Sequence, residues 1–333
     1  MAFPYQLNVR LAAYLAKKKM SGDTHFPLVT MLELTHACNL ACAGCGRIRE
    51  YEATLRDMLS VEDALASVEE SGAPVVAVTG GEPLIHPGIG EIVNGIIDSK
   101  RFVYLCTNAL LLEKSLDLFQ PNPYLCFNVH LDGLAETHDA IVCRNGIFDK
   151  AIEGITAAKS AGFQVVTNTT IYRQTDPQEI RSLFELLMDK DVDGLLVAPA
   201  FSYEAVEDDG LFLSRDDITD QFKTILSSPN GFRFYNTPLY LDFLKGERDY
   251  ECTAWGNPTR NPQGWKSPCY LITDEHYETF DEMMAETPWE NYGVGKDPRC
   301  QICMMHCGFE PTAVLEVGKD LRGLWKTAKW ALS

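Results

Sequence analysis

The sequence predicts an α/β protein: a partial (β/α)6 TIM-like barrel followed by a cysteine-containing C-terminal extension. Two observations predict this fold. Up to about residue 200, six short apolar runs alternate with amphipathic helical patterns, an order typical of parallel strands covered by helices. From about residue 205 the alternation fades, and prolines, aromatic residues and five of the eleven cysteines follow.

The first 24 residues are predicted to form an amphipathic helix. Apolar side chains recur there at helical spacing, next to basic ones: Leu7, Leu11, Tyr14, Leu15, Arg10 and the lysines at 17–19. Such a helix suits an anionic membrane surface. It equally suits a position across the bottom of the barrel, with its apolar stripe against the protein.

The barrel is expected over residues 25–205. Its strands are expected at Leu28–Leu34, Val75–Thr79, Phe102–Thr107, Tyr124–Leu131, Gln164–Ile171 and Gly194–Val197. Its helices are expected at Val61–Glu70, Ile89–Ser99, Phe148–Ala161 and Pro177–Asp189. In such a barrel the chemistry belongs at the C-terminal ends of the strands. Residues 206–333 are expected to form a C-terminal substrate or auxiliary domain.

Composition narrows the function classes. The chain has 333 residues and a formal net charge of −18, which disfavours nucleic acid as a partner. No apolar run approaches the ~20 residues that span a bilayer, and the N-terminus lacks the pattern of a signal peptide. The expected location is therefore cytoplasmic, where clustered cysteines indicate metal or redox chemistry rather than disulfides.

A cysteine motif follows the first predicted strand. Cys38, Cys42 and Cys45 have CxxxCxxC spacing. Three thiolates in one loop suit three irons of a [4Fe–4S] cube and leave the fourth iron open. A structural zinc site would normally need a fourth protein ligand, and none lies nearby in the sequence.

This motif resembles that of the radical S-adenosylmethionine (SAM) superfamily, in which the open iron chelates SAM. Further matches follow successive strands in the superfamily's order, and the resemblance implies that they bind SAM: Gly80, Gly81, Glu82, Pro83, Thr107, Asn108, Asn128, His130 and Asp132. Glu82 is expected to pair with the methionine ammonium. Ala109 replaces a usual glycine, and Gly44 replaces a usual aromatic residue. The missing aromatic is expected to leave room for a bulky substrate.

The second half of the chain resembles the adenosylhopane synthases. The similar segments are Pro199–Glu204, Trp255–Asn261, Gly264–Trp265, Pro268–Leu271 and Cys300–Gly308. The resemblance implies that SAM is a cosubstrate whose 5′-deoxyadenosyl group adds to the terminal alkene of the hopanoid diploptene. It also implies a one-electron reductant such as flavodoxin or ferredoxin, and peripheral contact with the inner face of the membrane where the substrate dissolves.

Addition to the alkene leaves a carbon radical that must gain a hydrogen atom. Cys106 ends the third predicted strand beside Thr107 and Asn108, so it is a candidate hydrogen donor; the alternative is a small core residue. Cys126 and Cys143 are expected in the core.

The C-terminal cysteines suggest a second metal site. Cys300, Cys303 and Cys307, with Cys269 or Cys252 as a fourth thiolate, suit an auxiliary Fe–S cluster or zinc. His306 is a further candidate ligand, and reduced cysteines that only pack the domain are the alternative. The apolar substrate pocket is expected among the aromatic residues Phe201, Tyr203, Phe232, Phe234, Tyr235, Tyr240, Phe243 and Trp255.

An alternative function uses the same barrel. A radical SAM maturase that modifies a peptide or protein by hydrogen abstraction would share the cluster loop, the SAM site and the cysteine-rich C-terminus. The two functions differ in their nucleoside product, because abstraction releases free 5′-deoxyadenosine whereas transfer attaches the adenosyl carbon to a lipid.

Overall fold

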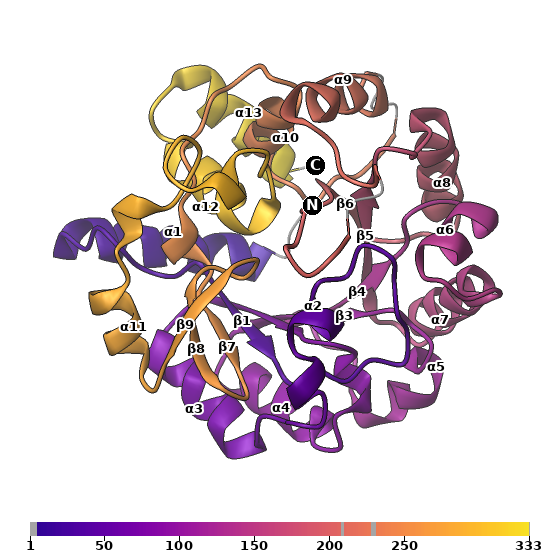
Figure 1. Cartoon of the computed structure of the whole chain (residues 1–333), viewed down its shortest axis with the longest axis horizontal. Helices are drawn as coiled ribbons and strands as arrows, with labels where there is room; N and C mark the ends of the chain where they lie inside the picture. Colours follow the sequence, from indigo (N-terminus) through magenta and orange to yellow (C-terminus); the bar gives the residue numbers. More distant parts are fainter. Residues whose placement is uncertain (1–4, 208–209, 228–230, 333) are drawn as a thin grey trace.

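The computed structural model describes residues 5–207, 210–227 and 231–332, so the first residues of the predicted N-terminal helix and the acidic pair at 208–209 lie outside it. One sheet organises the chain (Figure 1). Six parallel strands stand in sequence order: β1 Val29–Glu33, β2 Val75–Thr79, β3 Phe102–Thr107, β4 Leu125–His130, β5 Gln164–Ile171 and β6 Gly194–Pro199. All six predicted strands are present: β2, β3 and β5 have the predicted bounds, and the ends of the other three are shifted by one or two residues.

Helices cover the outer face of this sheet. The helices of the barrel are α2 Arg47–Glu50, α3 Val61–Ser71, α4 Ile89–Asp98, α5 Leu112–Ser115, α6 Ala135–Ile141, α7 Ile147–Ser160 and α8 Pro177–Asp189. Local signals fix their ends. Ser60 caps α3 by accepting a hydrogen bond from the Asp63 N–H, and Gly72 ends this helix in the left-handed conformation.

Strand alternation gives the sheet two different faces. Val103 and Leu105 on β3 point outward into the large core under the helices. The alternate residues of β3, Tyr104 and Cys106, point into the barrel interior, where the Asn128 side chain on β4 contacts the Cys106 sulfur. Functional side chains of neighbouring strands therefore meet in one interior.

The C-terminal part extends the same sheet. β7 (Thr259–Asn261) pairs in parallel with β1 on the side away from β2, and β8 (Gly264–Pro268) and β9 (Thr273–Tyr277) continue antiparallel. This antiparallel addition was not expected from the sequence. The helices of this part are α9 Arg215–Ile225, α10 Pro238–Leu244, α11 Phe280–Glu286, α12 His306–Glu316 and α13 Leu321–Leu332.

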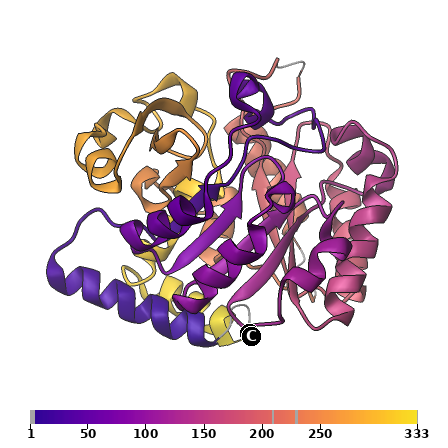
Figure 2. The same cartoon turned by 90° about the horizontal axis from the view of Figure 1, so that it is seen from below.

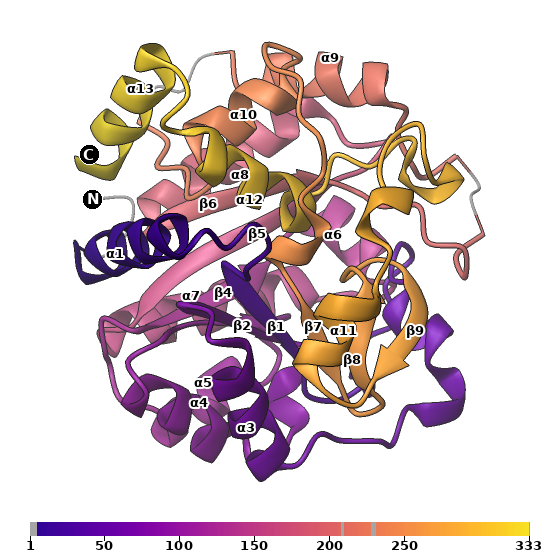
Figure 3. The ribbon, with the colours of Figure 1, turned by 90° about the vertical axis from the view of Figure 1, so that its left-hand side faces the viewer.

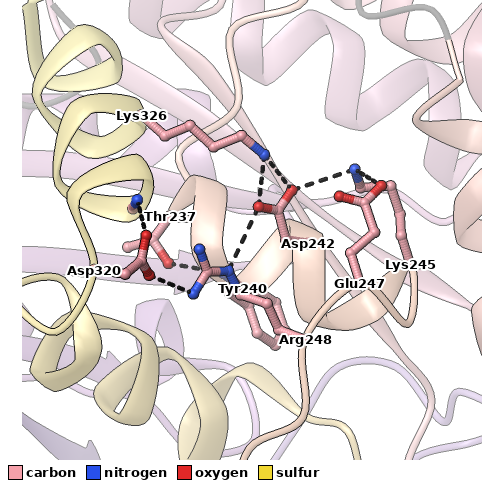
Figure 4. Close-up of polar contacts among 9 residues, drawn as sticks. Thr237, Tyr240, Asp242, Lys245, Glu247, Arg248, Asp320 and Lys326 are labelled. Atoms are coloured by element: carbon pink, nitrogen blue, oxygen red, sulfur yellow. Dashed lines mark hydrogen bonds and ion pairs between the residues drawn. The ribbon is translucent and has the colours of Figure 1, made fainter.

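An ion network fixes the last helix to the rest of the protein (Figure 4). The Lys326 ammonium of α13 lies 2.8 and 2.6 Å from the two carboxylate oxygens of Asp242 in α10. The Arg248 guanidinium contacts Asp320, just before α13, at 3.0 Å. Because the Asp242 carboxylate is buried, these contacts define how α13 is held.

The N-terminal helix α1 (Tyr5–Ser21) lies across the bottom of the barrel. Leu7 is buried against Val75 and Phe102, which begin β2 and β3. The Tyr14 hydroxyl donates a hydrogen bond to the Pro27 carbonyl. The apolar stripe of α1 thus faces the protein, as the second of the two sequence interpretations predicts. Within the described residues, no helix has both the length and the apolarity needed to cross a bilayer.

Candidate radical-generating site

The loop that carries Cys38, Cys42 and Cys45 closes over the C-terminal end of the barrel. Cys38 and Cys42 pack with Leu40, Val142 and Ile147, so apolar walls surround the thiols. Burial raises the pKa of the Cys38 thiol to about 11 and moves that of Cys42 in the same direction. The protein thus offers these thiols little help in ionising, and a bound metal has to supply the compensating positive charge.

The three thiols of the loop are the donors that a multinuclear cluster needs. In a [4Fe–4S] cube each thiolate binds a different iron, so three thiolates leave the fourth iron open. The donor set of the loop therefore fits the predicted cluster.

Gly80 and Gly81 pack against the strand that leads into the cysteine loop. The Gly81 N–H donates to the Thr35 carbonyl at 2.7 Å. A Cβ atom on Gly81 would lie 1.9 Å from the Ala37 oxygen, and one on Gly80 would lie 2.4 Å from the Thr35 oxygen. Glycine is thus required here for the approach of two protein segments, whereas a contact of either glycine with SAM remains a prediction.

Glu82 is the buried carboxylate at the centre of the site. Its oxygens accept hydrogen bonds from the Thr107 hydroxyl at 2.8 Å and from the Asn108 N–H at 2.9 Å. Burial raises the pKa of the carboxyl group to about 7, although these donors act to lower it. No cation lies beside Glu82 among the residues described. A ligand ammonium would fill this role, so the residues fit the amino group of SAM.

Thr107 and Asn108 connect this carboxylate to the cluster loop. The Asn108 side-chain amide donates to the Asn39 side chain at 2.7 Å, and its nitrogen lies 3.9 Å from the Cys38 sulfur. The next residue, Ala109, has a φ of +64°. This left-handed conformation explains why glycine is usual there, because a Cβ makes it costly by roughly 1–2 kcal/mol.

The predicted SAM residues in and just after β4 lie at two depths: His130 faces the barrel interior, and Asp132 is buried beneath it. The Nε2 atom of His130 lies 2.7 Å from the Asp132 carboxylate. Burial acts to lower the pKa of His130, but Asp132 outweighs it and the pKa is raised. Asp132 has no exposed surface and also accepts a hydrogen bond from the Thr170 N–H. It therefore positions His130 from beneath, while SAM contacts by Asn128 and His130 remain predictions.

Cys106 lies in the same interior as the SAM-site residues. The Asn128 amide nitrogen is 3.6 Å from its sulfur, and the two residues are register partners of β3 and β4. Burial raises the pKa of the Cys106 thiol to about 11, and the nearby Glu82 acts in the same direction. The thiol therefore keeps its hydrogen near neutral pH.

The other two barrel cysteines differ from each other. Cys126 is buried against Val166 and Tyr235, as expected. Cys143 is exposed, which corrects the expectation that it belongs to the core. It follows α6 at a φ of +56°, and this turn directs it away from the barrel.

Two tyrosines cover the loop beside Cys45: Tyr172, which sequence reasoning missed, and Tyr203, which it expected in the substrate pocket. A Cβ atom on Gly44 would lie 2.6 Å from the Tyr172 ring, and one on Gly46 would lie 2.3 Å from the Tyr203 ring. The space beside Gly44 is therefore filled by Tyr172, not open to a bulky substrate as expected. The glycines on both sides of Cys45 were the available signal, because close packing on backbone favours glycine.

A buried charged group adjoins the loop. The Arg47 guanidinium lies 3.1 Å from the Glu33 carboxylate and 4.9 Å from the Tyr270 ring. Lys266 donates to the Tyr270 carbonyl at 2.6 Å. Burial, followed by the charge of Arg47, lowers the pKa of Lys266 to about 8. Tyr270 thus links the barrel interior to the C-terminal extension.

The C-terminal cysteines line one cavity of about 610 Å³. All five are present: Cys252, Cys269, Cys300, Cys303 and Cys307. Gly308 allows the approach of Cys252, because a Cβ there would lie 2.4 Å from its sulfur. His306 is not among the lining residues. Of the predicted aromatic residues, Phe201 and Trp255 line the cavity, whereas Tyr240 and Phe243 lie in the core.

Sequence comparison matches the two parts of the chain to two families. Residues 32–187 match the radical SAM superfamily, and residues 195–327 match a domain of unknown function, DUF3463. The AdoMet-dependent heme synthase of Methanosarcina barkeri is 32% identical over 174 residues, which cover 50% of this chain and 49% of that protein. The subtilosin biosynthesis protein AlbA of Bacillus subtilis is 28% identical over 211 residues, covering 62% and 45%. The chain thus spans about half the length of these relatives.

Solved structures support the fold. Streptococcus suis SuiB superposes with a TM-score of 0.67 at 16% identity, over 89% of this chain and 75% of SuiB. This likeness confirms the predicted partial barrel with an open sheet. It carries no information about substrate, since the sequences have diverged so far.

Proposed function

We propose that this chain, which matches the radical SAM superfamily over residues 32–187, is a radical SAM enzyme with a [4Fe–4S] cluster and SAM, and that it transfers the 5′-deoxyadenosyl group. The acceptor is the terminal alkene of diploptene, and the product is adenosylhopane. The resemblance of the second half to adenosylhopane synthases supports this acceptor. Cys38, Cys42 and Cys45 hold the cluster, which when bound supplies the electron that cleaves the S–C5′ bond of SAM.

The chain's own residues orient the cosubstrate. Glu82 pairs with the methionine ammonium. Thr107 and Asn108 fix the direction of the Glu82 carboxylate by donating hydrogen bonds to it. Asn108 also reaches the loop at Asn39, so the ammonium site and the cluster loop are positioned together. Tyr172 and Tyr203 cover the loop beside Cys45 and exclude water from that side.

The observation that carries the proposal is the position of the Cys106 thiol in the barrel interior, 3.6 Å from the side-chain nitrogen of Asn128. Addition of the adenosyl carbon to the alkene forms one C–C bond and leaves an unpaired electron on the tertiary carbon. The Cys106 S–H bond breaks, its hydrogen atom completes the product, and the sulfur keeps the unpaired electron. One electron from an iron–sulfur or flavin protein and one proton restore the thiol. Hydrogen abstraction from a peptide would not need this donor.

The test is an anaerobic incubation with SAM, dithionite and diploptene, followed by mass spectrometry of nucleosides and lipids. The expected result is a lipid that carries the adenosyl group, formed in proportion to the methionine released. Free 5′-deoxyadenosine as the sole nucleoside product, with diploptene unchanged, would overturn adenosyl transfer.

A peptide-modifying maturase is the second candidate, and similar proteins favour it. SuiB has been solved with its precursor peptide SuiA, and AlbA is a bacteriocin biosynthesis protein. The sequence match to AlbA supports a peptide as the substrate, whereas the likeness to SuiB shows that the fold is shared with a protein that binds one. Under this alternative the same incubation yields 5′-deoxyadenosine even without diploptene once the right peptide is present.

The cavity of the five C-terminal thiols is proposed to bind an auxiliary Fe–S cluster. Four cysteines satisfy the irons of one cube, and Cys252 offers a fifth thiol at the same cavity. Zinc, which four of these thiolates could bind, is the alternative. Peripheral membrane contact also belongs to the proposed function, because diploptene dissolves in lipid.

A further inference from the structure

Two helices at opposite ends of the chain concentrate positive charge in an acidic protein. The chain has 29 basic and 47 acidic residues. The helices α1 and α13 contain seven of the basic residues and none of the acidic ones: Arg10, Lys17, Lys18, Lys19, Arg322, Lys326 and Lys329. Two of these charges are paired within the protein, because Lys18 contacts Asp23 and Lys326 contacts Asp242. Lys17, Lys19, Arg322 and Lys329 form no ion pair within the described chain.

The same two helices concentrate exposed apolar side chains. Eight large hydrophobic residues of the described chain are exposed, and five of them lie on α1 and α13. On α13 the exposed fractions are 86% for Leu321, 65% for Trp325 and 49% for Leu324. The Lys329 ammonium lies 5.5 Å from the Trp325 ring centre. A tryptophan next to lysine on an apolar helix face is typical of membrane interfaces.

Both helices lie on the side of the protein where the strands begin. Leu7 of α1 contacts the first residues of β2 and β3. On α13, the Trp330 indole N–H donates to the Phe234 carbonyl at 2.7 Å, and Phe234 pairs with Leu195 near the start of β6. Figures 2 and 3 show α1 and the end of α13 on one side of the molecule, away from α2 and the cysteine loop.

We propose that α1 and α13 together form a docking surface for an anionic lipid bilayer. Leu321, Leu324 and Trp325 enter the interfacial layer, and the lysines of α1 lie over the lipid phosphates. The apolar stripe of α1 cannot serve this purpose, because it packs on the barrel. The apolar contact therefore comes from α13 and much of the charge from α1.

A bilayer explains this surface better than an acidic electron-transfer protein does. A one-electron donor needs to approach the cysteine loop, and that loop lies at the other end of the strands. Exposed Leu and Trp side chains also add nothing to a purely electrostatic partner. The inference suits an enzyme that acts on a lipid, yet it depends on these two helices and not on the identity of the substrate.

The test measures co-sedimentation of the full chain with vesicles of phosphatidylcholine alone or mixed with phosphatidylglycerol. Binding is expected only to the mixed vesicles, with a blue shift of tryptophan emission that Trp325→Phe removes. The combined variant Lys17→Gln, Lys19→Gln and Lys329→Gln is expected to bind about 100-fold more weakly, at roughly fivefold for each lost charge. Lys114→Gln with Lys296→Gln, outside both helices, serves as the charge control.

Leucines of equal exposure provide the apolar control. Leu324 is 49% exposed and Leu118, on the barrel, is 50% exposed. Leu324→Ala is expected to weaken vesicle binding several-fold, and Leu118→Ala to leave it unchanged. Equal effects of the two variants, no binding to anionic vesicles, or a concentration-dependent dimer that Trp325→Ala dissociates would overturn the proposal.

A separate measurement distinguishes this surface from the proposed reaction. Turnover of SAM with diploptene in detergent micelles bypasses the membrane. Variants of α13 that lose vesicle binding are expected to keep this micellar turnover. If the unmodified protein binds vesicles but does not turn over SAM with diploptene, the proposed function is contradicted and the docking surface is not.

Discussion

The two cysteine-rich regions of this protein bury thiols in different ways. Cys38, Cys42 and Cys45 come from one loop of eight residues after β1, next to a carboxylate at Glu82. The thiols of the C-terminal cavity come from three separated segments, around residues 252, 269 and 300–307. In the proposed cluster the first set would leave one iron without a protein ligand, beside the Glu82 carboxylate. The second set has enough thiols to supply a ligand for every iron of a cube.

This difference teaches that thiol number alone does not assign a role. An open iron is useful only where other groups can bind and orient its ligand, and under the proposed function Glu82, Thr107 and Asn108 would do so at the first region. At the second, the cavity is lined both by aromatic residues such as Phe201 and Trp255 and by charged ones such as Arg215. We therefore expect reaction at the first region and electron transfer or structural support at the second.

The largest expected effect comes from removing each thiol set in turn. Cys38→Ala, Cys42→Ala and Cys45→Ala together should abolish SAM cleavage and lower the iron content from about eight to about four per chain. Cys300→Ser with Cys303→Ser and Cys307→Ser should lower the iron equally. The control is Cys143→Ser, which should keep all the iron. A starting content of about four irons, unaffected by the C-terminal variant, would remove the second cluster from the comparison.

Glu82→Gln tests the polar half of the first region. An ammonium–carboxylate contact contributes about 1.5–3 kcal/mol, so SAM affinity should fall by about 10- to 100-fold in titrations of the reconstituted protein. Because the carboxyl pKa is raised to about 7, wild-type affinity should rise with pH between about 6 and 8 as the carboxylate forms. The variant should show no such rise. A pH-independent wild type would contradict the pairing.

The same pKa shift has a consequence for stability. A carboxyl group whose pKa is higher when folded binds more protons in the folded state, so the free energy of unfolding falls as pH increases from about 4.5 to 7. Glu310 behaves alike, because burial raises its pKa to about 7 as well. The free energy of unfolding, measured by urea denaturation at several pH values, should therefore fall less steeply with pH in Glu82→Gln. Glu310→Gln should remove a further part of this pH dependence.

Cys106→Ala probes the thiol that belongs to neither set. Adenosyl transfer should continue, but products altered at the former alkene should accumulate because their radical gains no hydrogen from the protein. Mass spectrometry of the lipid fraction measures this. Cys126→Ala, which removes a buried thiol from the next strand, is the control and should give normal adenosylhopane. An unchanged product in Cys106→Ala would end its role as donor.

The smallest effect is expected at Gly44. An alanine Cβ would clash with Tyr172, so Gly44→Ala should destabilise the protein by about 1–3 kcal/mol and lower the occupancy of the cluster. Thermal unfolding and iron content measure both effects. Tyr172→Ala in the same chain should recover much of the stability. If the double variant were as unstable as the sum of the two single ones, the packing of Tyr172 on Gly44 would not be the cause.

Local signals made much of the barrel predictable. The strands are short apolar runs, and caps such as Ser60 and Gly72 mark where α3 begins and ends. The cluster motif was equally accessible, because all three cysteines belong to one loop. The exposure of Cys143 was not predictable, since a turn conformation decides it. The strands β7 to β9 were not predictable either, since they depend on the pairing of β7 with β1, more than 200 residues away.

By itself the sequence determined the alternation of strands and helices, the spacing of Cys38, Cys42 and Cys45, and the order of the motifs behind them. These features depend on residues near one another in the chain, where periodicity and spacing act directly. Only the tertiary structure decided that Tyr172 covers Gly44, that five thiols share one cavity, and that α1 turns its apolar stripe inward while α13 exposes its own. Those outcomes depend on which distant surfaces bury each other, and no local pattern encodes that choice.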